Sequence, residues 1–185
     1  RAPTASDEEG GFPVSTTPGL PRDPIAEAQR NWMRHGWEDT AAPMAAVTAI
    51  MRVQQILLSR AEAVLKPFGL TFARYELIAL LSFSREHQML MKKASALLQV
   101  HPTSVTNAVD RLEDAGLVRR EPLPSDRRAI TIVLTDRGTA VAAEATEALN
   151  RDLFRDTGFA PDEVDSLIAI LRRFRAHAGD FAIEG

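Results

Sequence analysis

The chain has 185 residues and a formal net charge of −3, and 45% of its residues are hydrophobic while only 6% are aromatic. This balance is typical of a soluble globular protein with an aliphatic core, and the absence of cysteine excludes disulfides, thiolate metal sites, catalytic thiols and thiol redox sensing. No uninterrupted apolar run approaches the roughly 18 residues of a membrane span, and the first residues lack the features of a secretory signal, so we expect a cytoplasmic protein without a membrane partner.

Residues 1–24 are predicted to form a flexible N-terminal arm, because five prolines and three glycines there cannot sustain a helix. Two interpretations of this arm stay open: an inert tail, and an arm that packs on a partner subunit. Asp23 followed by Pro24 has the pattern of an N-cap with a proline at the first helical position. A helix is therefore predicted to begin there and to end near Gly36.

The next segments predict a series of helices. Apolar residues recur every three or four positions from about Pro43 to Lys66, and Thr71 is expected to cap a third helix. A short helix is expected over 91–98, and another over 102–116 that Gly116 ends. Three helices with a tight connection between the second and the third form the outline of a helix-turn-helix unit.

After Gly116 the apolar period changes from 3.6 to 2, which predicts strands over 117–120 and 129–134 on either side of a turn region. Two such strands directly after a helix-turn-helix form a wing. An Ala-rich helix is predicted over 139–154 and a last helix over 162–174. The expected fold is mainly α (α+β): a winged helix-turn-helix with a two-stranded wing, and helices at both ends of the chain.

The helix over 102–116 has one face for the core and one that suits nucleic acid. The inward face consists of Val105, Ala108, Val109 and Leu112. Polar residues lie opposite, with Arg111 at the edge: Thr103, Thr106, Asn107 and Asp110. Short hydroxyl and amide side chains let a helix approach a duplex closely and bond to phosphates and base edges. We therefore predict DNA contacts from Thr103, Ser104, Thr106, Asn107 and Arg111, with a merely solvated polar face as the alternative.

The predicted wing tip carries Asp126, Arg127 and Arg128 as further candidates for DNA contact. Arginine suits a narrow minor groove, and the Asp126 carboxylate can hold the Arg128 guanidinium by a charge-assisted bond. The alternative is an ordinary exposed ion pair worth ~0–1 kcal/mol. Residues 85–137 hold nine basic and seven acidic side chains, whereas 144–185 hold five and nine. The middle of the chain is thus the part expected to face phosphates.

The run from Gln99 to Arg120 (QVHPTSVTNAVDRLEDAGLVRR), followed by Asp126-Arg127-Arg128 and by IVLTDRG over 132–138, resembles the MarR family of bacterial transcriptional regulators. Roughly residues 45–178 follow that family's plan. The resemblance implies a homodimer of winged helix-turn-helix subunits that represses transcription from pseudo-palindromic operators. It matches 102–111 to the recognition helix, and Asp126 and Arg128 to the wing-tip pair.

Three departures from the family pattern matter. His101 stands where the family commonly has a helix-capping Ser, and it either contacts phosphate or simply ends the turn. Leu123 and Ser125 occupy the places where many members carry an additional Asp-x-Arg, which reduces the expected phosphate contacts. The family's peroxide-sensing switch depends on cysteine and is excluded here.

On this plan the chain has four parts. They are a flexible arm (1–24), N-terminal helices contributing to dimerisation (25–66), a winged helix-turn-helix DNA-binding lobe (67–137) and C-terminal dimerisation helices (138–185). The last helix carries a stripe that is too apolar to leave in water, made of Val164, Leu167, Ile168, Leu171 and Phe174. Subunit pairing is the preferred explanation of this stripe, and packing within one chain is the alternative.

The resemblance also implies a small aromatic or phenolic effector, bound between the dimerisation helices and the DNA-binding lobe. The candidate ligand-binding residues are Trp37, Met51, Arg52, Phe72 and Tyr75, each of which also fits a plain core position. The four histidines lie far apart without metal-ligand spacing, so neither a metal site nor a cofactor is expected.

Together these patterns predict a sequence-specific DNA-binding transcriptional regulator. It is expected to be a repressor that acts as a homodimer and is released by a small aromatic ligand. No motif of a serine hydrolase, a zinc protease or a nucleotide-binding loop occurs, so no enzyme is expected. The alternative is a winged-helix module that binds a protein and not DNA. A steep loss of affinity with salt would distinguish DNA binding from it.

Overall fold

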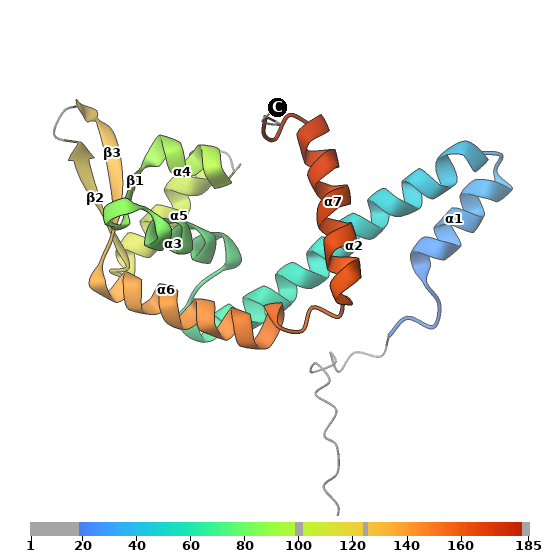
Figure 1. Ribbon diagram of the computed structural model, residues 1–185, viewed down its shortest axis with the longest axis horizontal. Helices are drawn as coiled ribbons and strands as arrows, with labels where there is room; N and C mark the ends of the chain where they lie inside the picture. The colour runs from blue at the N-terminus through green and yellow to red at the C-terminus, as the bar shows by residue number, and fades with distance from the viewer. Residues whose placement is uncertain (1–18, 99–101, 124–125, 183–185) are drawn as a thin grey trace, which may run out of the picture. The chain divides into compact units, whose positions relative to one another are not determined.

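The computed structural model describes residues 19–98, 102–123 and 126–182 (Figure 1). The chain divides into two compact units, with the boundary between Gln55 and Ile56. Most of the predicted arm lies outside the described residues, and its last residues, from Gly19 to Asp23, form an irregular stretch before the first helix.

The first unit contains α1 (Pro24–Arg34) and the beginning of α2 (Glu38–Leu65). The prediction that α1 starts at Asp23-Pro24 is confirmed, since the Asp23 carboxylate accepts a hydrogen bond from the Ile25 N–H at 2.9 Å. In the sequence prediction α2 begins at Pro43, whereas the structure has Pro43 inside the helix. Two acidic side chains in the first turn, Glu38 and Asp39, interact favourably with the helix dipole at this earlier start.

The helical segment Glu38–Phe68 is long and apolar enough, by length and composition alone, to cross a membrane. This finding corrects the expectation that no apolar stretch approaches a membrane span. The expectation counted uninterrupted apolar runs, whereas the average over a window stays apolar despite isolated polar residues such as Thr48 and Arg52. A single helix of this kind is weak evidence for a membrane span. Its large exposed apolar side chains in the first unit are Val47, Ile50, Met51 and Val53.

The core of the second unit is built around α3 (Phe72–Phe83). This helix follows the short 3-10 turn Lys66–Phe68, and the Thr71 hydroxyl caps it by accepting a hydrogen bond from the Arg74 N–H, as predicted. It contacts α4 (Met91–Leu98), α5 (Pro102–Asp114) and α6 (Asp136–Leu149). Fully buried residues from these helices and the sheet include Leu77, Ile78, Leu81, Leu112, Ile132 and Leu149.

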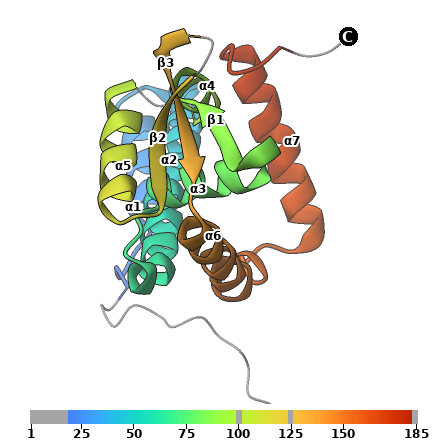
Figure 2. The ribbon, with the colours of Figure 1, turned by 90° about the vertical axis from the view of Figure 1, so that its left-hand side faces the viewer.

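The sheet has three antiparallel strands in the order β1-β3-β2, with β1 at Gln88–Leu90, β2 at Val118–Leu123 and β3 at Asp126–Leu134. Figure 2 shows α5 beside β2 at one edge and β1 at the other. The predicted two-stranded wing is correct for β2 and β3, but the short strand β1 was not predicted. The hairpin is also longer than predicted, since β2 continues through Pro122, which an edge strand tolerates.

A close contact joins α6 to the base of the wing. The Thr135 hydroxyl caps α6 by accepting a hydrogen bond from the Gly138 N–H at 2.9 Å. The same hydroxyl lies 2.8 Å from the Gly116 carbonyl oxygen and 3.1 Å from that of Leu117, to which it donates. Because of this cap, α6 starts at Asp136, earlier than the predicted Thr139.

The C-terminal segment continues α6 as a π-helical turn, Asn150–Phe154, and then forms α7 (Pro161–His177). No residue of α7 is buried. Four of its apolar side chains are large and exposed: Leu167, Ile168, Ile170 and Phe174. The chain taken alone therefore leaves an apolar stripe of α7 open to solvent.

Candidate nucleic-acid interface

The two predicted faces of α5 are present in the structure. Val105, Val109 and Leu112 are at most 1% exposed and pack in the core, and Ala108 lies partly buried against it, so the predicted inward face is confirmed. The predicted DNA-contacting residues of this helix are all exposed: Thr103, Ser104, Thr106, Asn107 and Arg111. These residues therefore lie on the solvent-facing side of α5.

The helix before α5 adds positive charge that the sequence-based site does not include. Lys92 and Lys93 lie in the first turn of α4 and are exposed. In helix-turn-helix proteins the first helix of the motif crosses the phosphate backbone, so these lysines are candidates for phosphate contact. His101, the departure from the family's helix cap, lies outside the described residues.

The wing hairpin contains the predicted tip residues. Asp126 is exposed at the first position of β3, and Arg127 and Arg128 follow it in the same strand. The side chains of these two arginines, and Ser125, lie outside the described part of the structure. The predicted pairing of Asp126 with Arg128 therefore stays a prediction.

A cluster of ion pairs that the sequence did not predict joins β2 to α5. The Arg120 guanidinium donates hydrogen bonds to the carboxylates of Asp110 and Glu113, and lies 3.4 Å from the Thr106 carbonyl oxygen. The Arg120 backbone N–H donates to the second carboxylate oxygen of Glu113 at 3.0 Å. Burial lowers the pKa of Arg120, but its hydrogen bonds to Asp110 and Glu113 outweigh burial and raise that pKa above its ordinary value.

One sequence signal could have found this cluster. Asp110 and Glu113 are three residues apart on α5 and therefore share one side of the helix. Two carboxylates on a helix that faces phosphates would repel them unless a cation lies nearby. Arg120, in the strand that follows the helix, is such a cation. The neighbouring Arg119 behaves differently, since it forms an exposed ion pair of 2.5 Å with Glu121 of its own strand.

The five predicted ligand-binding residues belong to different units. Trp37, Met51 and Arg52 lie in the first unit and are exposed, with Trp37 at 52% and Met51 at 62%. Phe72 and Tyr75 lie on α3 in the second unit, with ring centroids 6.2 Å apart. Tyr75 is buried, and its hydroxyl hydrogen-bonds with the Thr146 hydroxyl of α6 at 3.0 Å. The core interpretation therefore fits Tyr75.

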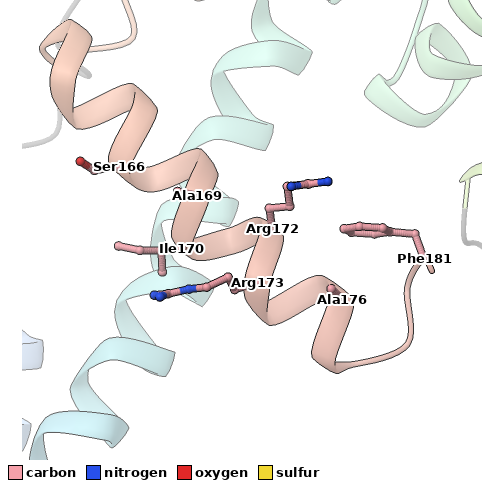
Figure 3. A pocket seen from close by; sticks show the side chains of 7 residues that line it. All are labelled: Ser166, Ala169, Ile170, Arg172, Arg173, Ala176 and Phe181. Atoms are coloured by element: carbon pink, nitrogen blue, oxygen red, sulfur yellow. The ribbon is translucent and has the colours of Figure 1, made fainter. Parts of the chain in front are cut away.

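Two surface depressions lie elsewhere in the second unit. One, of about 390 Å³, lies between the end of α3 and α6 and includes Phe83, His87 and Glu147. The other, of about 460 Å³, is lined by residues of α7 and by Phe181 (Figure 3). There the Cζ atom of Arg172 lies 5.8 Å from the centre of the Phe181 ring. Neither depression is lined by a predicted ligand residue. Among the described residues no group of three or more His, Asp or Glu side chains could hold a metal ion.

Known proteins resemble this chain over most of its length. The MarR family profile matches residues 68–129. The HTH-type transcriptional regulator YkoM of Bacillus subtilis is 32% identical over 114 residues, which is 61% of this chain and 73% of that protein. The MarR family transcriptional regulator Sco5413 of Streptomyces coelicolor is 46% identical, with a TM-score of 0.70 over 76% of this chain and 97% of the other.

A structure solved in complex with DNA is also similar. It is the MarR family transcriptional regulator Sco3205 of Streptomyces coelicolor, 26% identical, with a TM-score of 0.63 over 71% of this chain and 85% of that one. The matched region, the winged helix-turn-helix geometry and the identity to these regulators agree with one another. The chain belongs to the MarR family of transcriptional regulators.

Proposed function

We propose that this protein is a sequence-specific transcriptional repressor that binds a pseudo-palindromic operator as a homodimer. The single observation that carries the proposal is the division of α5 into a buried apolar face and an exposed polar face, next to a β-hairpin wing. In this arrangement α5 enters the major groove, and the tip of the wing, with Arg127 and Arg128, enters the adjacent minor groove. The DNA complex of Sco3205 supports the proposal.

The homodimer is supported by the apolar side chains that the single chain leaves exposed. On α7 these are Leu167, Ile168, Ile170 and Phe174, and on α2 they include Val47 and Ile50. Burial of such surface contributes roughly 25 cal/mol per Å². A two-fold pair of subunits also sets the spacing of two copies of α5, which has to match one turn of DNA, ~34–36 Å.

Release by a small aromatic or phenolic ligand completes the proposal. A ligand of this kind acts if it binds better to a dimer whose α5 spacing does not fit DNA. Of the predicted ligand residues, Trp37, Met51 and Arg52 are exposed, which supports a role in binding more than a role in the core. MarR-family regulators are DNA-binding transcription factors and not enzymes, so the proposed function has no catalytic step. The proposed location is the cytoplasm.

Salt dependence tests the DNA-binding function. Wild-type protein is used to enrich duplexes from a random-sequence pool, and its affinity for the enriched duplex is measured at several salt concentrations. A regulator with six to ten phosphate contacts is expected to lose about 10³- to 10⁵-fold in affinity between about 50 and 200 mM salt, because counterions are released. Failure to enrich any sequence, or an affinity that hardly changes with salt, would favour the protein-interaction module.

Replacing Asn107 by alanine tests the orientation of α5. Asparagine discriminates a base through two hydrogen bonds in the major groove, so the variant is expected to lose about 1–3 kcal/mol and to accept other bases at one position of each half-site. Binding to a set of single-base variants of the enriched duplex measures this. Unchanged base preference in the variant would mean that this side of α5 does not face the bases.

A further inference from the structure

We propose that Arg120 is a positioning residue for DNA recognition. It links β2, the first strand of the wing, to the recognition helix α5, and it neutralises the negative charge of two carboxylates on that helix. The inference rests on the DNA-binding function proposed above. In the sequence Arg120 is only one of nine basic residues in the segment 85–137. Its contacts in the structure set it apart from them.

The contacts of Arg120 fix the wing and the helix in one relative orientation. The planar guanidinium bonds to Asp110 through one terminal nitrogen and to Glu113 through the other. The nitrogen that bonds Asp110 also lies 3.4 Å from the Thr106 carbonyl oxygen, one turn earlier on α5. A lysine ammonium is a single point charge without this fork of donors, so only arginine holds both carboxylates in this geometry.

Glu113 adds a backbone link in the opposite direction. Its second carboxylate oxygen accepts the hydrogen bond from the Arg120 backbone N–H at 3.0 Å. Since β2 is an edge strand of the sheet, a helix side chain bonded to its backbone ties α5 directly to the wing. The wing and the recognition helix then move as one body, which keeps the contacts in the two grooves in register.

Arg120 also removes an electrostatic obstacle. The side chains of Asp110 and Glu113 are 52% and 39% exposed, whereas that of Arg120 is only 24% exposed. Two unpaired carboxylates on a DNA-facing helix would repel phosphates within a screening distance of about 8–10 Å. The positive charge of Arg120 is therefore directed at the helix and not at DNA, so its removal exposes two negative charges at once.

The test compares Arg120→Ala with the matched control Arg119→Ala. Arg119 is the preceding residue of β2, its loss changes the net charge equally, and its ion pair stays within β2. Affinity is measured for two probes, the duplex enriched by the wild type and an unselected random-sequence duplex. Arg120→Ala is expected to lower the ratio of the two affinities about tenfold or more, while Arg119→Ala weakens binding to both probes alike and keeps the ratio.

A neutral version of the cluster separates positioning from charge. The triple variant Asp110→Asn, Glu113→Gln, Arg120→Gln carries no charge at these positions but has side chains of similar size. If Arg120 positions the wing, the ratio of affinities in this variant stays near the value of Arg120→Ala. Recovery to the wild-type ratio would overturn the positioning role.

Folding is monitored separately, so that a damaged fold is not mistaken for lost positioning. Circular dichroism and urea unfolding are recorded for every variant. Arg120→Lys keeps the charge and is the milder substitution, so it replaces Arg120→Ala in the test if that variant does not fold. Its ratio of affinities for the enriched and the random-sequence duplex is expected to fall about three- to tenfold. Equal ratios for the Arg120 and Arg119 variants would overturn the proposal. If the wild type enriches no sequence, the DNA-binding function fails first, and the role of Arg120 fails with it.

Discussion

Replacing Gly138 by alanine is expected to lower the free energy of unfolding by about 3 kcal/mol, because no side chain fits at this position. A Cβ atom there would lie 2.0 Å from the Leu117 carbonyl oxygen and 2.8 Å from a methyl group of Leu134. The first of these neighbours is backbone and cannot rotate away. To make room, α6 would have to move away from the base of the wing, which would also weaken the cap that Thr135 forms on the Gly138 N–H.

Urea unfolding followed by circular dichroism measures this effect, at a fixed protein concentration because a dimer's stability depends on concentration. Gly19→Ala is the matched control, since a Cβ atom at Gly19 meets nothing within 4 Å and its φ is not in the left-handed region. The control is expected to unfold within about 0.5 kcal/mol of the wild type. A Gly138→Ala protein as stable as the control would show that α6 does not approach the wing as closely as described.

The faces of α5 could be predicted from the sequence because they depend on local periodicity. Val105, Val109 and Leu112 repeat at helical spacing, and the helix needs only its own residues to define an inner side. The cap of α3 by Thr71 is local in the same way, since donor and acceptor lie three residues apart. Features of this kind are encoded within a single turn of helix.

The features that could not be predicted depend on pairing between distant segments. The strand β1 has only three residues, and it exists because Met89 pairs with Ile132, far along the chain. The Arg120 cluster likewise requires β2 to fold back along α5, which brings together residues up to 14 positions apart. Short strands and ion pairs leave almost no periodic signal of their own, so the tertiary fold must be known first.

The proposed ligand residues show a third limit. Trp37 and Tyr75 are both aromatic candidates for ligand binding in the sequence, yet Trp37 is 52% exposed and Tyr75 only 8%. The difference arises because Tyr75 faces α6, where Thr146 satisfies its hydroxyl. Which aromatic side chains remain available to a ligand is therefore decided by the neighbouring helix and not by the local pattern.

Introducing two charges on the exposed stripe of α7, as Ile168→Glu with Phe174→Glu, is expected to convert the proposed homodimer into monomers. These side chains are 58% and 69% exposed in the single chain. Burial of an isoleucine or phenylalanine contributes roughly 1.5–3 kcal/mol, and in a two-fold interface each position counts twice. The loss of about 6–12 kcal/mol corresponds to a dissociation constant raised by at least about 10⁴-fold. Sedimentation at micromolar protein concentration measures the mass directly.

Ala169→Glu is the matched control, because the same residue is introduced on the same helix but away from the apolar stripe. It is expected to remain dimeric. Two results separate the proposed interface from packing of α7 within one chain. If α7 packs only on its own subunit, the double variant loses unfolding free energy without any change in mass. If α7 forms the interface, the mass halves while the winged lobe stays folded, and affinity for the enriched duplex falls because a monomer engages one half-site at a time.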